Sequence, residues 1–166
     1  MAVAPKLILA SNSPRRRELL SLSGWAFSVQ PAQVDESPLP GEKPGDYVLR
    51  LAQAKAREAA AAGRAGRLVL AADTTVALDG DLLGKPGDAA EAADMLRRLR
   101  GRSHQVYTGL AALTAPDGNL VTDLCVTAVP MRNYRDEEIE AYVASGDPLD
   151  KAGAYAIQHP GFHPVE

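Results

Sequence analysis

The chain has 166 residues, with 18 lysines and arginines against 21 aspartates and glutamates, and its formal net charge of −3 excludes a global attraction to nucleic acid or anionic lipid. Cys125 is the single cysteine, which excludes an intramolecular disulfide and favours a reducing compartment, and no apolar run approaches the roughly 18 residues of a membrane span. We therefore expect one cytoplasmic domain over residues 1–166, with no nucleic-acid partner and no membrane partner.

Apolar runs and turn residues predict an alternation of strands and helices along the chain. In chain order, we expect a strand over 7–10, a helix over 14–23, a strand over 25–30, a loop over 31–44, a helix over 46–63, a strand over 68–72 that ends at Asp73, a strand over 74–78, a helix over 88–99, strands over 105–113 and 120–131, and a helix over 136–145. Asp79-Gly80 and the segment 116–119 are strong turn signals, and the stretch 149–166 is loop-like. This mixture favours an α/β domain with a mixed sheet.

Local signals add detail to three of these helices. In the first helix, we expect Leu19, Leu20 and Leu22 to face the core. Asp88 and Asp136 are the residue type that caps the N-terminus of a helix, and each precedes an apolar-periodic segment.

Three arginines follow Pro14 in the first turn of the first predicted helix. Cations there meet the positive end of the helix dipole and are disfavoured by roughly 0.3–1 kcal/mol each. A bound anion would resolve the conflict, because the hydroxyls of Ser11 and Ser13, the free N–H groups of the first turn, and the guanidinium groups of Arg15 and Arg16 together form a phosphate site. The glycine-rich stretch of a P-loop is absent, and a solvated basic helix start is an equally good interpretation.

Three carboxylates occupy positions that suit a metal site. Asp73 ends an apolar run, at the place where α/β folds bind ligands, and Asp35 and Glu36 lie in the proline-rich loop. Together they could hold Mg²⁺ or Mn²⁺, which prefer oxygen ligands and bind substrate phosphates. Taken singly, a turn-forming aspartate and a solvated acidic pair are the commoner interpretations.

Two lysines are the remaining candidates for phosphate contacts. Lys55 lies beside the apolar side of its predicted helix, and Lys85 is held between Gly84 and Pro86. Either lysine alone is more often a surface residue, but with the two arginines they would supply four cations for a polyphosphate. Cys125 has no obvious base partner, and we expect a core thiol.

Seven short motifs occur in a fixed order over nearly the whole chain, and in them the chain resembles the Maf family. They are Ser11-Asn12-Ser13-Pro14-Arg15-Arg16, Val34-Asp35-Glu36, Gln53-Ala54-Lys55-Ala56, Ala72-Asp73-Thr74, Gly84-Lys85-Pro86, Gly101-Arg102-Ser103-His104 with Thr108-Gly109, and Asp150-Lys151-Ala152-Gly153-Ala154-Tyr155 with Ile157-Gln158. One such motif is weak evidence, whereas seven in order are highly specific.

The resemblance implies a fold and an activity. The fold is the inosine-triphosphatase-like (Maf/Ham1) α/β fold, a mixed twisted sheet flanked by helices with a central substrate cleft. The activity is cleavage of a nucleoside triphosphate into the monophosphate and pyrophosphate with a divalent metal. Family chains usually continue past the position of Glu166 with a further strand and a helix, so the domain over 1–166 is expected to lack these elements. A homodimer is expected on the resemblance alone.

The resemblance also implies residue roles. Asp73 matches the family's proposed catalytic carboxylate. Arg15, Thr74 and Gln158 match positions tied to base preference and look like the branch that acts on dTTP and UTP. The branch that acts on 7-methyl-GTP usually carries Trp, Gln and Glu at these three places.

A mechanism combines the residue-based candidates with the resemblance. In it, Asp73 activates or orients the attacking water and shares a divalent metal with Glu36, while cations and hydroxyls neutralise the triphosphate. The neutralising residues are Ser11, Ser13, Arg15, Arg16, Lys55 and Lys85. Three alternatives stay open: a nucleotide-binding regulator of cell division with little catalysis, a pyrophosphatase of the 7-methyl-GTP type, and a structural module that binds phosphate.

Overall fold

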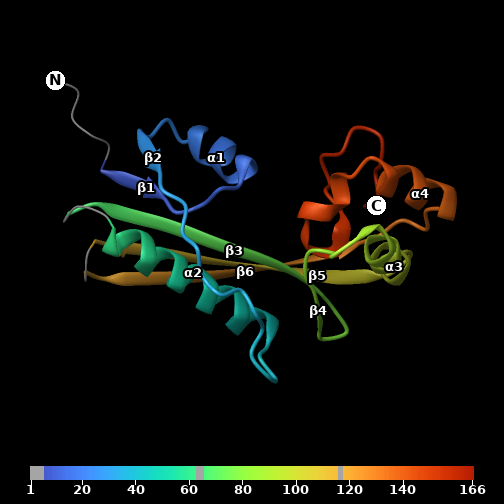
Figure 1. Ribbon diagram of the computed structural model, residues 1–166, viewed down its shortest axis with the longest axis horizontal. Coiled ribbons are helices and arrows are strands. Elements are labelled where there is room, and N and C mark those ends of the chain that lie inside the picture. Colours follow the sequence, from blue (N-terminus) through green and yellow to red (C-terminus); the bar gives the residue numbers. More distant parts are fainter. Residues whose placement is uncertain (1–5, 63–65, 116–117) are drawn as a thin grey trace. The chain divides into compact units, whose positions relative to one another are not determined.

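A mixed sheet organises the residues that this computed structural model describes, which are 6–62, 66–115 and 118–166 (Figure 1). Within them the sheet has six strands in the order β2-β1-β3-β5-β6, and β4 pairs with β3 off this path. The elements are β1 (Leu7–Leu9), α1 (Pro14–Ser21), β2 (Phe27–Val29), α2 (Pro44–Ala61), β3 (Leu68–Leu78), β4 (Asp81–Leu83), α3 (Ala89–Leu99), β5 (Ser103–Thr114), β6 (Leu120–Pro130), α4 (Asp136–Ala144) and the 3₁₀ helices η1 (Asp147–Asp150) and η2 (Ala152–Ala154). The predicted α/β class, with a mixed sheet flanked by helices, is confirmed.

Strand β1 lies between two parallel neighbours. Ile8 pairs in register with Ser28 of β2 on one side and with Val69 of β3 on the other. All three residues of β1 are buried, so both faces of the strand are covered, as is typical of parallel sheets. The loop that follows β1 therefore begins at the carboxyl end of a buried strand, where α/β folds place ligands.

The predicted turn at Asp79-Gly80 is confirmed. Strands β3 and β4 are antiparallel, and Leu78 pairs with Asp81 across a two-residue connection. Asp79 and Gly80 have φ angles of 53° and 92°, and positive values at both positions define the type I′ turn that suits a hairpin.

The chain forms two compact units. The first comprises Met1–Asp73 and Thr108–Cys125, and the second comprises Thr74–Tyr107 and Val126–Glu166. Strands β3, β5 and β6 each contribute residues to both units. The single domain over 1–166 stays a prediction.

Helix α2 packs against the strands of the first unit. Its alanines lie at helical spacing along one side and join side chains of β1, β3 and β5 in the core. The approach is close, because a Cβ added at Gly109 of β5 would lie 2.6 Å from the backbone oxygen of Val48 in α2. The core of this unit comprises Ile8, Ala10, Ala52, Ala56, Ala59, Ala60, Val69, Ala71, Ala111, Leu113 and Ala115.

The second unit has its own core, built around α3 and α4. Asp88 accepts a hydrogen bond from the backbone of Glu91 and caps α3, as predicted. The core contains apolar side chains of both helices together with a ring stack of Tyr142 on Phe162, whose centroids lie 4.4 Å apart. The 3₁₀ helices η1 and η2 follow α4, and η2 adds Ala154 to this core.

Two predictions about elements are wrong. Leu19 and Leu22 are 67% and 79% exposed, because helical spacing groups side chains on one side of α1 but does not supply a layer to cover them. Asp73 does not end a strand, because β3 runs unbroken from Leu68 to Leu78. The carboxylate is tolerated inside the strand because it has a cationic partner, described below.

Smaller corrections concern element ends and one thiol. Asp136 is the first residue of α4 rather than its cap, and the backbone N–H of Arg135 donates to Glu138 at 2.9 Å instead. Cys125 is exposed on β6, so the expected core thiol is wrong. The predicted helix end at 63 and part of the predicted turn at 116–119 lie outside the described residues. No helix in the described part of the chain combines the length and the apolar content that crossing a membrane requires.

Candidate active site

Lys55 joins two carboxylates from separate parts of the first unit. Its Nζ lies 2.6 Å from Glu36 Oε1 and 2.7 Å from Asp73 Oδ1. The side chains of Lys55 and Asp73 are 11% and 10% exposed, whereas that of Glu36 is 49% exposed. These ion pairs explain why a lysine lies beside the apolar side of α2, and they bring three predicted site residues together.

Burial and ion pairing act in opposite directions on these groups. Burial raises the pKa of the Asp73 carboxyl and outweighs the lowering caused by the hydrogen bond from Lys55. Burial alone would lower the pKa of Lys55, but the hydrogen bonds to Asp73 and Glu36 raise it overall. Lys55 therefore stays an ammonium, while Asp73 is a stronger base than a surface aspartate, as proton abstraction from water requires.

The loop from β1 to α1 uses both predicted serines. Ser13 is the N-cap of α1 and accepts from the backbone of Arg16 at 3.4 Å. Ser11 is buried and accepts from the backbone N–H of Ser13 at 3.1 Å. In both bonds the serine oxygen is the acceptor, so each hydroxyl hydrogen can still donate to an anion.

Arg16 connects the first turn of α1 to the strand that carries Asp73. Its Nη1 donates to the backbone oxygen of Ala72 at 2.8 Å. Burial lowers the pKa of Arg16, and the nearby charges of Asp73 and Glu36 raise it in part, which places the guanidinium within the field of both acids. Arg15, the neighbouring residue, is exposed. Of the two predicted arginines, the structure brings Arg16 to the acidic pair.

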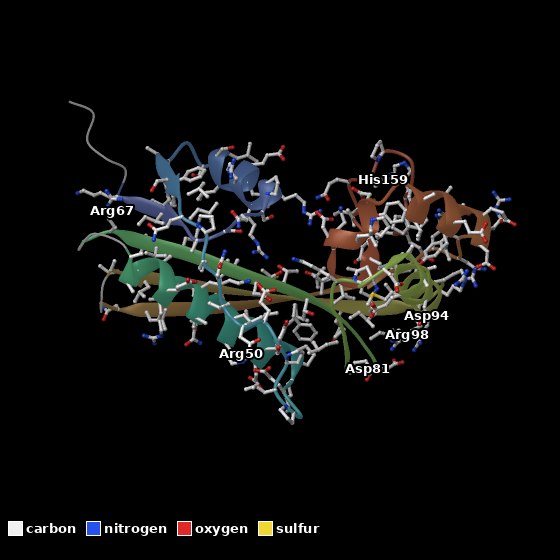
Figure 2. All side chains as sticks on the ribbon, in the orientation of Figure 1. Arg50, Arg67, Asp81, Asp94, Arg98 and His159 are labelled. Atoms are coloured by element: carbon white, nitrogen blue, oxygen red, sulfur yellow. The ribbon has the colours of Figure 1, made fainter. Side chains whose placement is uncertain are left out.

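The loop over residues 36–42 is fastened to α2 by two side chains. Arg50 of α2 (Figure 2) donates to Glu42 through Nε at 2.6 Å and through Nη2 at 2.7 Å, and Nη2 also reaches the backbone oxygen of Ser37 at 3.1 Å. The Tyr47 hydroxyl donates to the backbone oxygen of Glu36 at 2.8 Å. A two-point Arg–carboxylate pair fixes orientation as well as distance. These bonds therefore hold the loop that presents Glu36 to Lys55.

Thr74, Lys85 and Gln158 belong to the second unit. Lys85 and Gln158 are exposed, and Lys85 lies in the loop after β4. The backbone N–H of Gly153 donates to the carbonyl of Gly84 at 3.0 Å, which ties that loop to η2. Gly153 has a φ of 70°, and an added Cβ would meet Val76 at 2.9 Å, so only glycine fits there. The roles of these three predicted site residues stay predictions.

A buried histidine and tyrosine connect β5 of the second unit to the segment before Gln158. His104 Nε2 and Tyr155 Oη are hydrogen-bonded at 2.7 Å, and their rings meet edge to face. His104 is 2% exposed and its Nδ1 has no hydrogen-bond partner among the described residues. Burial lowers the pKa of His104 to about 4, so the ring is neutral at pH 7.

The donor set at Lys55 suits a hard divalent cation. Glu36 and Asp73 offer carboxylate oxygens that approach the same nitrogen atom, and Mg²⁺ is usually held by one or two carboxylates plus waters and substrate phosphates. Asp35 does not join them, and its carboxylate accepts the backbone N–H of Ser37 at 2.9 Å. Among the described residues, no three aspartate, glutamate, histidine or cysteine side chains gather in a metal-binding group.

Sequence reasoning missed the supporting residues. Tyr47, Arg50 and Glu42 received no role from the sequence alone. Arg50 and Glu42 are eight positions apart and only one of them is helical, so no helix-spacing rule links them. For Tyr47, a hydroxyl on an otherwise apolar side was the available signal, since a half-buried tyrosine hydroxyl usually has a partner.

Comparisons with known proteins agree with this fold. A family model described as Maf-like protein matches residues 6–166. The chain is 50% identical over 159 residues to a protein of Geobacter sp. (strain M21) named dTTP/UTP pyrophosphatase, covering 96% of this chain and 82% of that protein. It is 53% identical over 156 residues to a protein of Moorella thermoacetica with the same name, covering 94% and 80%. The structure of the Staphylococcus aureus Ham1 protein matches with a TM-score of 0.57 at 16% identity, covering 96% of this chain and 79% of that one, which confirms the predicted fold.

Proposed function

Because the chain belongs to the Maf family, we propose that it hydrolyses dTTP and UTP to the nucleoside monophosphate and pyrophosphate. The observation that carries the proposal is the nearly buried ion pair of Lys55 with Asp73, which the half-exposed Glu36 joins, beside the guanidinium of Arg16. Cations next to a partly desolvated acid are what cleavage of a phosphoric anhydride requires. Relatives of about half identity that carry the name of this activity support the same conclusion.

Charge neutralisation is the largest task in this reaction, since the triphosphate and the leaving pyrophosphate are both highly anionic. The first turn of α1 presents backbone N–H groups, and Ser11 and Ser13 add hydroxyl donors. The cations of this proposal are Arg15, Arg16, Lys55 and Lys85. Asp73 accepts the proton of the attacking water, a role that its raised pKa supports.

A divalent metal, Mg²⁺ or Mn²⁺, fits the two carboxylates of Glu36 and Asp73. When bound, such an ion supplies charge stabilisation at the phosphoryl oxygens. Glu36 suits the role because its side chain is half exposed and can turn toward a hydrated ion, whereas Asp73 is held inside β3. Arg50 and Tyr47 keep the Glu36 loop in place for this purpose.

Base preference is assigned to Arg15, Thr74 and Gln158. Uracil and thymine present an N3–H donor between two carbonyl acceptors. The Gln158 amide can accept from N3–H and donate to a neighbouring carbonyl at the same time, whereas an ionised glutamate could only accept. We also propose a cytoplasmic location, which the single cysteine supports, and a homodimer, which the family resemblance supports.

Release of pyrophosphate from purified protein tests the function. The panel is dTTP, UTP, CTP, GTP and 7-methyl-GTP, each with Mg²⁺. We expect dTTP and UTP to be the best substrates. Preference for 7-methyl-GTP would assign the chain to the other branch, and binding of nucleotides without any pyrophosphate release would favour a regulator.

Asp73→Asn tests the catalytic assignment. We expect turnover of dTTP to fall by about 100-fold or more, because general-base catalysis contributes on that scale. The matched control is Asp94→Asn, an exposed aspartate on α3 (Figure 2), which should leave turnover unchanged. Near-normal turnover by Asp73→Asn at saturating Mg²⁺ would remove Asp73 from the catalytic role.

A further inference from the structure

The ammonium of Lys55 lies between the two carboxylates that the proposed function assigns to a metal. Its Nζ is 2.6 Å from Glu36 and 2.7 Å from Asp73, which are full ion-pair distances. The lysine therefore offsets one of the two negative charges of the acidic pair in the free protein. Any cation that binds Glu36 and Asp73 through the same oxygens needs the position that the ammonium holds.

A lone divalent ion has little to gain in this arrangement. With Lys55 in place, the ion would meet a positive charge a few ångströms away, in surroundings where Asp73 and Lys55 are nearly buried and solvent screening is weak. Binding would also require the ion to lose part of its hydration shell, which Mg²⁺ does reluctantly. The free site thus disfavours metal even though its carboxylates suit metal chemically.

A triphosphate changes this balance. Lysine has a flexible four-carbon stem and a rotatable ammonium, so its charge can move from a carboxylate to a phosphate without movement of α2. The partly exposed side chain of Glu36 can release Lys55 toward solvent and reach a cation that arrives there. Arg16 is bonded to Ala72 and not to Lys55, so movement of the lysine need not remove the guanidinium charge near Asp73.

We propose that Lys55 holds the metal position in the free protein and that the divalent cation enters only together with the triphosphate, whose phosphates draw the ammonium away. The substrate is then the metal–nucleotide complex, and the free protein does not load metal first. This inference rests on the proposed function, because it takes Glu36 and Asp73 as the metal-binding pair.

Direct measurement of bound Mn²⁺ tests the inference without relying on turnover. Mn²⁺ retained by the protein is measured by equilibrium dialysis and electron paramagnetic resonance. The samples are wild type, Lys55→Met, and the control Lys43→Met, which removes an exposed lysine just before α2. Each is measured alone and with a dTTP analogue that carries a methylene group between the α- and β-phosphates.

We expect Lys55→Met to bind Mn²⁺ without nucleotide at least about 10-fold more tightly than wild type, since the competing charge is gone. Wild type and Lys43→Met should retain Mn²⁺ only when the analogue is present. Equal Mn²⁺ affinity of Lys55→Met and wild type would overturn the inference and leave Lys55 as a structural link between α2 and β3. If Lys55→Met does not fold, wild type alone decides, because tight binding of Mn²⁺ without the analogue contradicts the proposal.

The same samples separate this inference from the proposed function. If wild type releases pyrophosphate from dTTP but Lys55→Met gains no Mn²⁺ affinity, the proposed function is supported. The proposal that Lys55 holds the metal position is then refuted. Absence of release from any nucleotide would remove the function, whatever the Mn²⁺ measurements show.

Discussion

Gly109 sets how closely helix α2 can approach strand β5, and Gly109→Ala should therefore disturb the active site from a distance. The added Cβ would lie 2.6 Å from the oxygen of Val48, 2.7 Å from its carbonyl carbon and 2.8 Å from the nitrogen of Leu49. All three are backbone atoms, so no side chain can turn aside. Restoring a contact of 3.4 Å requires α2 and β5 to separate by about 3.4 − 2.6 = 0.8 Å.

Two consequences follow from this separation. Overpacking of a close contact typically costs about 1–3 kcal/mol, so the free energy of unfolding should fall by that amount. Lys55 lies seven residues beyond Val48 on the same helix, about 10 Å along its axis, and a shift of α2 would move it relative to Asp73. Because misplacement by about 1 Å can cost about 100-fold in rate, we expect turnover of dTTP to fall by at least about 10-fold.

Urea unfolding and pyrophosphate release measure the two effects separately. Gly84→Ala is the control for stability, because no atom lies within 4 Å of its added Cβ and its φ is not positive. An unchanged free energy of unfolding in Gly109→Ala would contradict the expected cost of separating α2 from β5. Lower stability with full turnover would refute the argument that the position of α2 determines that of Lys55.

Three further predictions concern charge and base choice. Burial lowers the pKa of His104 to about 4, so below pH 6.5 the unfolded chain binds more protons than the folded chain. The contribution of the neutral His104 to the free energy of unfolding should therefore be full above pH 6.5, and that free energy should fall by about 2 kcal/mol between pH 7.5 and 5. Urea unfolding should show this slope in His163→Gln, whose histidine is exposed, and lose it in His104→Gln; an unchanged slope in His104→Gln would contradict the assignment. Arg50→Gln should raise the Mg²⁺ concentration for half-maximal pyrophosphate release by about 10-fold, as loss of a residue supporting a metal ligand does. The control is Arg98→Gln, which removes an exposed ion pair with Asp81 (Figure 2). An equal Mg²⁺ requirement of the two variants would contradict a role of the Glu36 loop in metal binding. Gln158→Glu should lower turnover of dTTP and UTP more than that of GTP, and equal losses on all three would argue against base reading.

Local signals predicted the parts of the fold that depend on neighbouring residues. The turn at Asp79-Gly80 needs two positive φ angles, and that dipeptide is among the few that supply them. The cap at Asp88 similarly depends on a hydroxyl or carboxylate one position before the helix. The buried strand β1 followed from its apolar run.

The parts that failed depend on partners far along the chain. Asp73 was expected at a strand end, since nothing nearby shows that Lys55, 18 positions earlier, neutralises it. The leucines of α1 were expected inside because spacing identifies a side of a helix but not the layer against it. The grouping of Lys55, Asp73 and Glu36 was expected as a functional hypothesis, but the order of contact, with the lysine between the acids, could come only from coordinates.

Substitution of Arg16 would change the stability and the turnover of the protein together. Its guanidinium donates one N–H to the carbonyl of Ala72, which links the first turn of α1 to β3, the strand that contains Asp73. Alanine at this position would remove both the proposed contact with the triphosphate and the link between α1 and β3. If both the melting temperature and the turnover of Arg16→Ala fall, the fall in melting temperature measures the loss of this structural link. If the melting temperature is unaltered, the whole loss of turnover comes from the lost contact with the triphosphate.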